Sequence, residues 1–74
     1  MYNYFGDIMY KKLYKIRKSK KISIYDMEKL TGINATHYYL IEKGDRILFY
    51  DTAIKISAVF NMKPDELFYT KKSS

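Results

Sequence analysis

The sequence has no cysteine, one histidine, one proline and three glycines among its 74 residues. Without cysteine the chain can form no disulfide, no thiolate metal site and no thiol nucleophile, and this composition fits a reducing cytoplasm. Apolar runs stay well below the roughly 20 residues that a membrane-spanning helix needs, and the N-terminus lacks a signal-peptide pattern. No glycine-rich phosphate loop or nucleophile motif occurs. We therefore expect a cytoplasmic protein that is not an enzyme and uses no cofactor or small-molecule substrate.

The few residues with side chains suited to catalysis or metal binding have simpler explanations. His37 is the only histidine, and a lone histidine without cysteine is a poor set of metal ligands. No nucleophile or orienting carboxylate stands at a spacing that would make it a general base. Asp65 and Glu66 follow Pro64 at an expected helix start, where carboxylates stabilise the helix dipole. We predict no metal site and no catalytic residue.

The net charge of +6 is concentrated near the N-terminus. Residues 11–21 contain seven of the fourteen basic residues and no acid, whereas bases and acids cancel from residue 22 onward. A basic segment is typical of a surface that binds nucleic acid or an anionic membrane. The alternative is a solvated helix face that keeps a small domain soluble. Membrane binding is disfavoured because this helix needs its apolar side for the core.

Apolar residues at helical spacing predict an all-α fold with five helices. The first helix should cover about residues 8–20 with Asp7 as its N-cap, and the fourth should start at Asp51 or Thr52 and stop at Asn61. Leu67 and Phe68 of a short fifth helix should close the core. The residues expected to face inward in the first and fourth helices are Met9, Leu13, Ile16, Ala53, Ile56, Val59 and Phe60.

Residues 23–44, SIYDMEKLTGINATHYYLIEKG, predict two short helices joined by a tight turn. Ser23 is a good N-cap with Asp26 placed to complete a capping box. Met27 and Leu30 should face inward, and Gly32 can take the left-handed conformation that often ends a helix.

The second helix of this segment begins after a further cap. Asn34 is the expected N-cap, Tyr38 and Ile41 continue the inward stripe, and Gly44 ends the helix. A helix, a short glycine turn and a helix form the arrangement that lets one helix enter the DNA major groove.

From about residue 9 to 68 the chain resembles the Cro/CI-type (lambda-repressor-like, XRE-type) helix-turn-helix proteins. The resemblance rests on the segment around Ser23, TGIN at 31–34, IEKGDR at 41–46 and NMKPDELF at 61–68, in the correct order and spacing. It implies a compact five-helix bundle that binds operator DNA, usually as a symmetric dimer.

The resemblance also assigns residues and boundaries. It places a recognition helix at 34–43 in the major groove, and an ion pair between Arg17 and Glu42 that we interpret as structural. The chain divides into an N-terminal extension (1–7), the domain (8–69, motif 23–43) and a disordered tail (70–74). The positions implied to face base edges are Ala35, Thr36, His37, Tyr39 and Leu40. The positions implied to contact phosphates are Ser23, Ile24, Asn34, Lys43 and Arg46.

Two departures from the family pattern bear on DNA reading. Ile24 stands where a polar residue, often glutamine, is usual, and Glu28 replaces a small alanine. No Arg, Asn or Gln follows the Asn34 cap, so bidentate base recognition is not available. Ala35 and the Thr36 methyl could pack on thymine methyls, which suits an A·T-rich operator or one recognised by shape.

The apolar run at 47–50 (Ile, Leu, Phe, Tyr) has two interpretations. Phe49 or Tyr50 could cap the fourth helix against the core, or the run could form a homodimer contact together with residues 67–69. The preferred function is a transcriptional repressor of bacterial, phage or mobile-element type. The alternative is a protein-interaction module, an antirepressor or accessory factor, in which Tyr39 and Leu40 anchor a protein partner.

Overall fold

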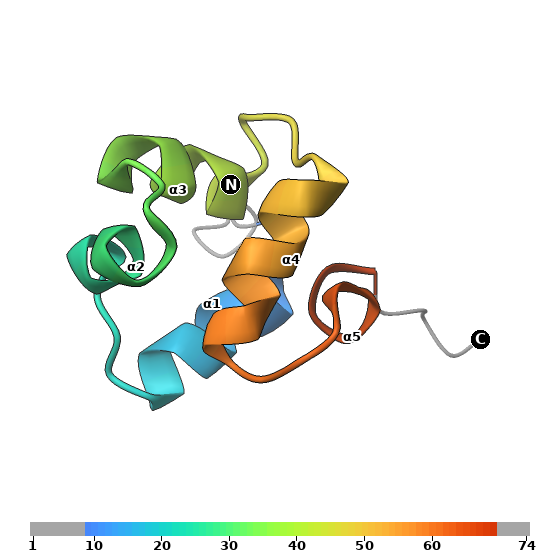
Figure 1. Cartoon of the computed structure of the whole chain (residues 1–74), viewed down its shortest axis with the longest axis horizontal. Helices are drawn as coiled ribbons and strands as arrows, with labels where there is room; N and C mark the ends of the chain where they lie inside the picture. The colour runs from blue at the N-terminus through green and yellow to red at the C-terminus, as the bar shows by residue number, and fades with distance from the viewer. Residues whose placement is uncertain (1–8, 70–74) are drawn as a thin grey trace, which may run out of the picture.

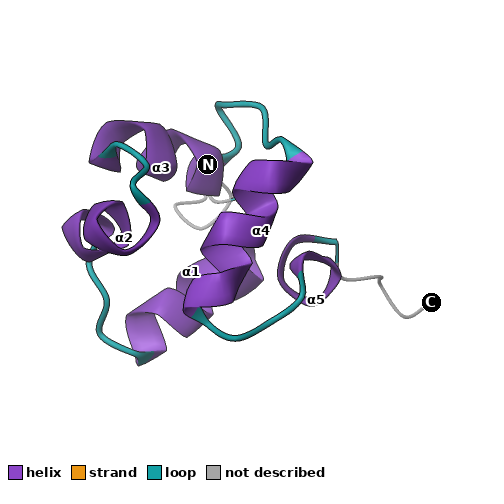
Figure 2. Ribbon diagram, viewed as in Figure 1, coloured by secondary structure: helices purple, strands orange, loops and turns teal. Residues whose placement is uncertain are grey.

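A computed structural model describes residues 9–69 and contains five α-helices and no strand in that range (Figures 1 and 2). This is the all-α, five-helix bundle that the sequence predicts. The segments predicted as an N-terminal extension (1–7) and a disordered tail (70–74) lie outside the described residues. The helices are α1 (Lys11–Ser19), α2 (Ile24–Thr31), α3 (Ala35–Lys43), α4 (Tyr50–Val59) and α5 (Pro64–Phe68).

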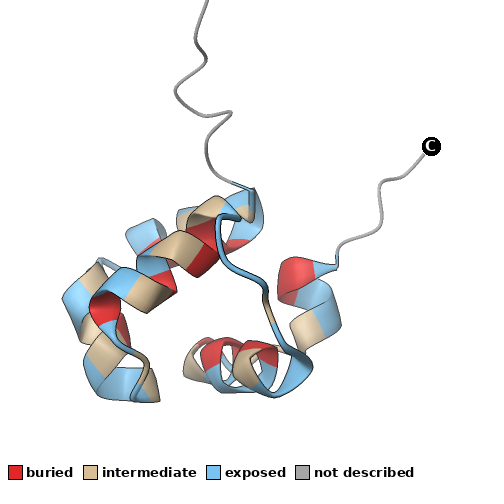
Figure 3. Ribbon diagram, turned by 90° about the horizontal axis from the view of Figure 1, so that it is seen from above, coloured by how far each residue is buried: buried red, intermediate tan, exposed pale blue. Residues whose placement is uncertain are grey.

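The helices pack around one small apolar core. α2 contacts α3 and α4, α1 contacts α3 and α5, and α4 contacts α5. The buried parts of the helices face the interior and the exposed parts face outward (Figure 3). The buried core side chains are Leu13, Met27, Tyr38, Ile41, Ala53, Ile56, Phe60, Leu67 and Phe68. Most of the predicted inward positions are therefore confirmed.

The start of α1 differs from the prediction. The helix begins at Lys11 with Tyr10 as its N-cap, not at residue 8, and the predicted cap Asp7 lies outside the described residues. The backbone N–H groups of Met9 and Tyr10 donate to the carbonyls of Lys43 and Glu42, both at 3.2 Å. These bonds tie the chain to the end of α3 instead of continuing a helix. Met9 is consequently 63% exposed rather than buried.

Leu30 is 58% exposed, so its predicted inward position is wrong. α2 has only eight residues, and its inner side is set by Met27 together with Ile24 and Thr31, which follow at helical spacing of three and four. Leu30 falls outside this narrow side. The spacing of Met27 and Leu30 alone did not define which face of this two-turn helix is buried.

The C-terminal half follows the predicted order with small shifts. α4 begins at Tyr50, one residue before the earliest predicted start, and Asn61 lies beyond its end with a φ of 55°. Val59 is only half-buried. Phe49 and Tyr50 are 66% and 61% exposed, so neither covers the core. The dimer contact suggested for residues 67 and 68 is also wrong, because both side chains are buried in the core.

Candidate nucleic-acid interface

The turn between α2 and α3 is built from the predicted caps. Ser23 Oγ accepts a hydrogen bond from the Asp26 N–H at 3.0 Å, and the Ser23 N–H donates to Asp26 Oδ2 at 2.9 Å. The Ser23 N–H, followed by the Ser23 hydroxyl, lowers the pKa of the Asp26 carboxyl below its ordinary value. Gly32 ends α2 with a φ of 81°. The capping box is therefore present in full.

The start of α3 is fixed by a second cap. Asn34 Oδ1 accepts from the N–H groups of Thr36 and His37 at 2.9 and 3.3 Å. The asparagine side chain thus satisfies two of the N–H groups that lack a partner within the helix. The helix ends at Gly44, whose φ is 94°.

A buried charged cluster fixes α3 against α1. Arg17 Nε and Nη2 donate to the two carboxylate oxygens of Glu42 at 2.9 and 3.0 Å, so the ion pair implied by the resemblance is present. Arg17 Nη1 donates to the Ile22 carbonyl and the Tyr38 hydroxyl donates to Glu42. Because the carboxylate accepts three hydrogen bonds, two of them from a guanidinium, its burial carries no unpaired charge. The orientation of α3 is therefore held from the inside.

The same cluster shifts two pKa values. Burial acts to lower the pKa of Arg17, but the hydrogen bonds and the charge of Glu42 outweigh it and raise this pKa. Burial, reinforced by the charge of Glu42, strongly raises the pKa of Tyr38. Both groups therefore keep their protons across the physiological pH range.

The outer face of α3 carries four of the five predicted base-reading residues. Thr36 and Tyr39 are exposed, and His37 and Leu40 are half-buried. Ala35 is buried, with 8% of its surface exposed, because the first residue of α3 lies against α2. Ala35 therefore lines the gap between the two helices rather than the outer face of α3, and its contact with a base stays a prediction.

The predicted phosphate-contacting residues differ in which of their donor groups are already used within the protein. Asn34 keeps its amide nitrogen as a donor, because only its oxygen acts as the cap. The Ser23 N–H is occupied by Asp26, which leaves the hydroxyl proton and the Ile24 N–H of the first turn. Lys43 Nζ lies 3.6 Å from Asp45 and 5.5 Å from the Tyr39 ring centroid.

Arg46 is exposed, and the structure gives its guanidinium no hydrogen bond or ion pair within residues 9–69.

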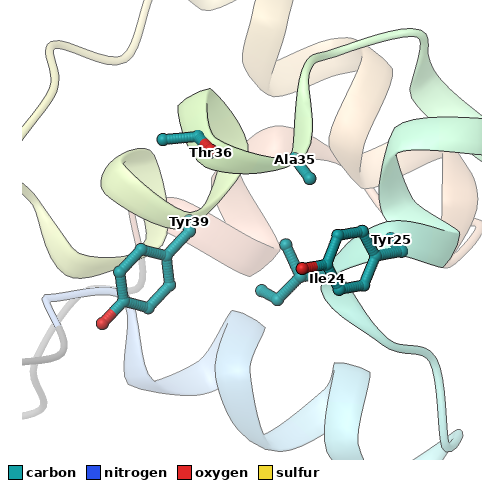
Figure 4. Close-up of a pocket in the computed structure, with 5 residues that line it drawn as sticks. All are labelled: Ile24, Tyr25, Ala35, Thr36 and Tyr39. Atoms are coloured by element: carbon teal, nitrogen blue, oxygen red, sulfur yellow. The ribbon is translucent and has the colours of Figure 1, made fainter.

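A surface hollow of about 240 Å³ lies between α2 and α3, and we call it the α2–α3 hollow. It is lined by Ile24, Tyr25, Ala35, Thr36 and Tyr39. In Figure 4 the rings of Tyr25 and Tyr39 stand on either side of Ile24, with the Ala35 methyl beside them. The hollow lies at the start of both helices of the motif.

A second hollow, of about 290 Å³, lies at the junction of α1 and α2 and is called the basic hollow here. It is lined by Arg17, Lys18, Lys21, Ile22 and Ser23. Sequence reasoning identified the basic run but did not place Lys18 and Lys21 beside Ser23. The two lysines are brought there by a local turn of the chain, because α1 ends at Ser19 and Lys21 takes a left-handed φ of 57°.

Comparison with known proteins identifies the family. A family model described as a helix-turn-helix domain matches residues 10–73. The chain belongs to this family, which is of the XRE/Cro-CI-like type, and this membership supports DNA binding and a role in transcription regulation. Comparison with curated proteins and with solved structures gave no match. Proteins of this type are typically not enzymes.

Residues 9–69 hold no group of three or more His, Asp or Glu side chains that could bind a metal ion. None of their helices combines the length and apolar composition needed to cross a membrane.

Proposed function

We propose that this protein is a sequence-specific transcriptional repressor that places α3 in the major groove of double-stranded DNA. In this function α3 reads bases through Thr36, His37, Tyr39 and Leu40, and the bound protein blocks polymerase by occupying the promoter. The observation that carries the proposal is the exposed face of α3 between two groups of cations.

These cations flank the reading face at both ends. The basic hollow lies next to the α2 residues that line the α2–α3 hollow, with Ser23 and Ile24 as neighbours in the chain. At the other end, Lys43 lies over the Tyr39 ring and Arg46 follows in the next loop. Phosphate contacts set the register of a protein on DNA, and base contacts specify sequence. Cations on both sides of an exposed helix suit this division.

The test is the salt dependence of duplex binding. Lys43→Ala and Arg46→Ala should weaken binding to every sequence and flatten the slope of log K against log salt by about one unit each. Lys55→Ala is the matched control, because Lys55 is an exposed lysine of α4 outside the site. Slopes that match the Lys55→Ala protein would remove these residues from the phosphate interface.

A dimer is the second part of the proposal. The loop before α4 and the outer side of α4 expose Ile47, Phe49, Tyr50 and Ile54 by 73, 66, 61 and 46%. Tyr50 and Ile54 lie one turn apart on one side of the helix. Two copies joined here would present two α3 helices to half-sites about 34 Å apart. Sedimentation should show a dimer that Phe49→Ser dissociates, and a native monomer on DNA would contradict it.

The alternative function is a protein-interaction module. It is favoured by the exposed apolar surface of the motif, with Tyr25 72%, Leu30 58% and Tyr39 46% exposed. If the partner is a protein, Tyr39→Ala should weaken binding more than Lys43→Ala or Arg46→Ala does. Salt should have little effect on the affinity, because apolar anchors carry the energy of such interfaces. The salt series above therefore separates the two functions.

A further inference from the structure

The α2–α3 hollow has a lining that is unusual for a surface that reads DNA. None of its five residues carries a charge or an amide side chain. Ile24 and Ala35 supply only hydrocarbon, and Tyr25 and Tyr39 add two ring faces. Ile24 also packs against the core, which fixes the floor of the hollow in place. The floor of the hollow is therefore apolar, and its hydrogen-bonding side-chain groups are the hydroxyls of Tyr25, Thr36 and Tyr39.

The major groove has one kind of apolar group that fits such a surface. Of the four bases, only thymine presents a methyl group there, on C5, beside its hydrogen-bonding groups. A polar base edge placed against Ile24 and Ala35 would lose water without gaining a partner. A methyl group would gain from burial, by a factor of roughly four in affinity for each one removed from water.

We infer that the α2–α3 hollow binds the C5-methyl groups of pyrimidines in duplex DNA. This inference rests on the proposed function, since it names what the reading surface selects. The occupant is DNA rather than an apolar protein segment because cations lie near two of the residues that line the hollow. Lys43 lies 5.5 Å from the ring of its lining residue Tyr39, and the basic hollow adjoins it at Ser23. The chemical class recognised is 5-methylpyrimidine, which includes thymine and 5-methylcytosine.

The experiment compares duplexes that differ only in the methyl group. The first pair is an alternating A·T duplex of about 20 base pairs and the same duplex with uracil for thymine. The second pair is a mixed-sequence duplex with cytosine and the same duplex with 5-methylcytosine in its place. At about 150 mM salt, the methylated member of each pair should bind at least roughly four-fold more tightly. Uracil keeps every polar group of thymine, so this contrast isolates the methyl group.

Two variants assign the effect to the hollow. Ile24→Ala removes its floor and Tyr25→Ala one of its walls, and both should reduce the contrast within each pair. Tyr25 is 72% exposed, so its variant will fold even if Ile24→Ala is destabilised. Lys55→Ala, in an exposed residue of α4 outside the hollow, is the control and should leave the contrast unchanged.

The outcomes separate this inference from the function on which it rests. Equal binding to thymine and uracil duplexes, with duplex binding retained, would overturn the methyl-binding site and leave the DNA-binding function standing. An unchanged contrast in the Tyr25→Ala protein would place methyl recognition elsewhere and overturn the assignment to the hollow. Failure to bind any duplex at this salt would overturn the function and the inference together.

Discussion

Two adjacent tyrosines of α3 show how the helix separates structure from function at the scale of single residues. Tyr38 is fully buried and its hydroxyl donates to Glu42 at 2.8 Å, whereas Tyr39 is 46% exposed on the outer face. Tyr38 completes the hydrogen bonding of the buried carboxylate. Tyr39 lines the α2–α3 hollow and is free to contact a ligand.

Removing one hydroxyl should therefore have unequal effects on stability at the two positions. Tyr38→Phe takes a donor from a buried charged group and should lower the free energy of unfolding by about 1.5–3 kcal/mol. Tyr39→Phe should change it by less than about 0.5 kcal/mol. Urea denaturation of both variants measures the difference. Equal stabilities would mean that the Tyr38 hydroxyl does not contribute to holding α3.

Residue burial was predictable where the apolar spacing is long and regular. Leu13, Tyr38, Ile41 and Ile56 repeat over helices of nine or ten residues, and all four are buried. The prediction that Leu30 faces inward was wrong because an eight-residue helix gives too few turns to define its inner side. The hydrogen bond from Tyr38 to Glu42 could not be predicted from spacing, since it depends on how α1 and α3 meet.

At the scale of elements, two glycines end the helices of the motif in different surroundings. Both have positive φ, 81° at Gly32 and 94° at Gly44. A side-chain Cβ at Gly32 would meet open space, whereas one at Gly44 would lie 2.6 Å from the Cβ of Met9. The second glycine thus allows the segment before α1 to pass close to the end of α3.

This difference predicts unequal costs of alanine. Gly32→Ala should destabilise the protein by about 1–2 kcal/mol through the left-handed backbone alone. Gly44→Ala should cost about 1–3 kcal/mol more, because Met9 must also move. Thermal unfolding of the two variants compares them directly, with Gly32→Ala as the control for backbone strain. Equal losses would show that Met9 does not pack against Gly44 in solution.

The helices and their caps could largely be predicted from the sequence, but their tertiary contacts could not. The Ser23 capping box, the Asn34 cap and Pro64 at the start of α5 are local signals, and each is present. The start of α1 was predicted too early because Met9 and Tyr10, which precede the helix, bond to the end of α3. This is a contact between distant parts of the chain. Local chemistry predicts helix ends well only where the cap is also local.

At the scale of the whole molecule, cations from separate parts of the chain lie near the motif, with Lys18 and Lys21 beside Ser23 and Lys43 over the Tyr39 ring. The basic run of residues 11–21 was visible in the sequence, and the bend at Lys21 brings part of it beside the first turn of α2. The α2–α3 hollow was not predictable, because its lining comes from two helices whose packing decides it. Composition indicated a nucleic-acid surface, and the fold locates the surface that we propose for it.

The most direct test of that proposal is selection of bound fragments from a random duplex pool at about 150 mM salt. Our account predicts recovery of an inverted repeat with A·T-rich half-sites about one helical turn apart. It also predicts that the Tyr39→Ala protein, whose cations are intact, recovers no such motif. If the native chain enriches no sequence and releases DNA at this salt, its binding is only the non-specific effect of charge, and the repressor function is contradicted.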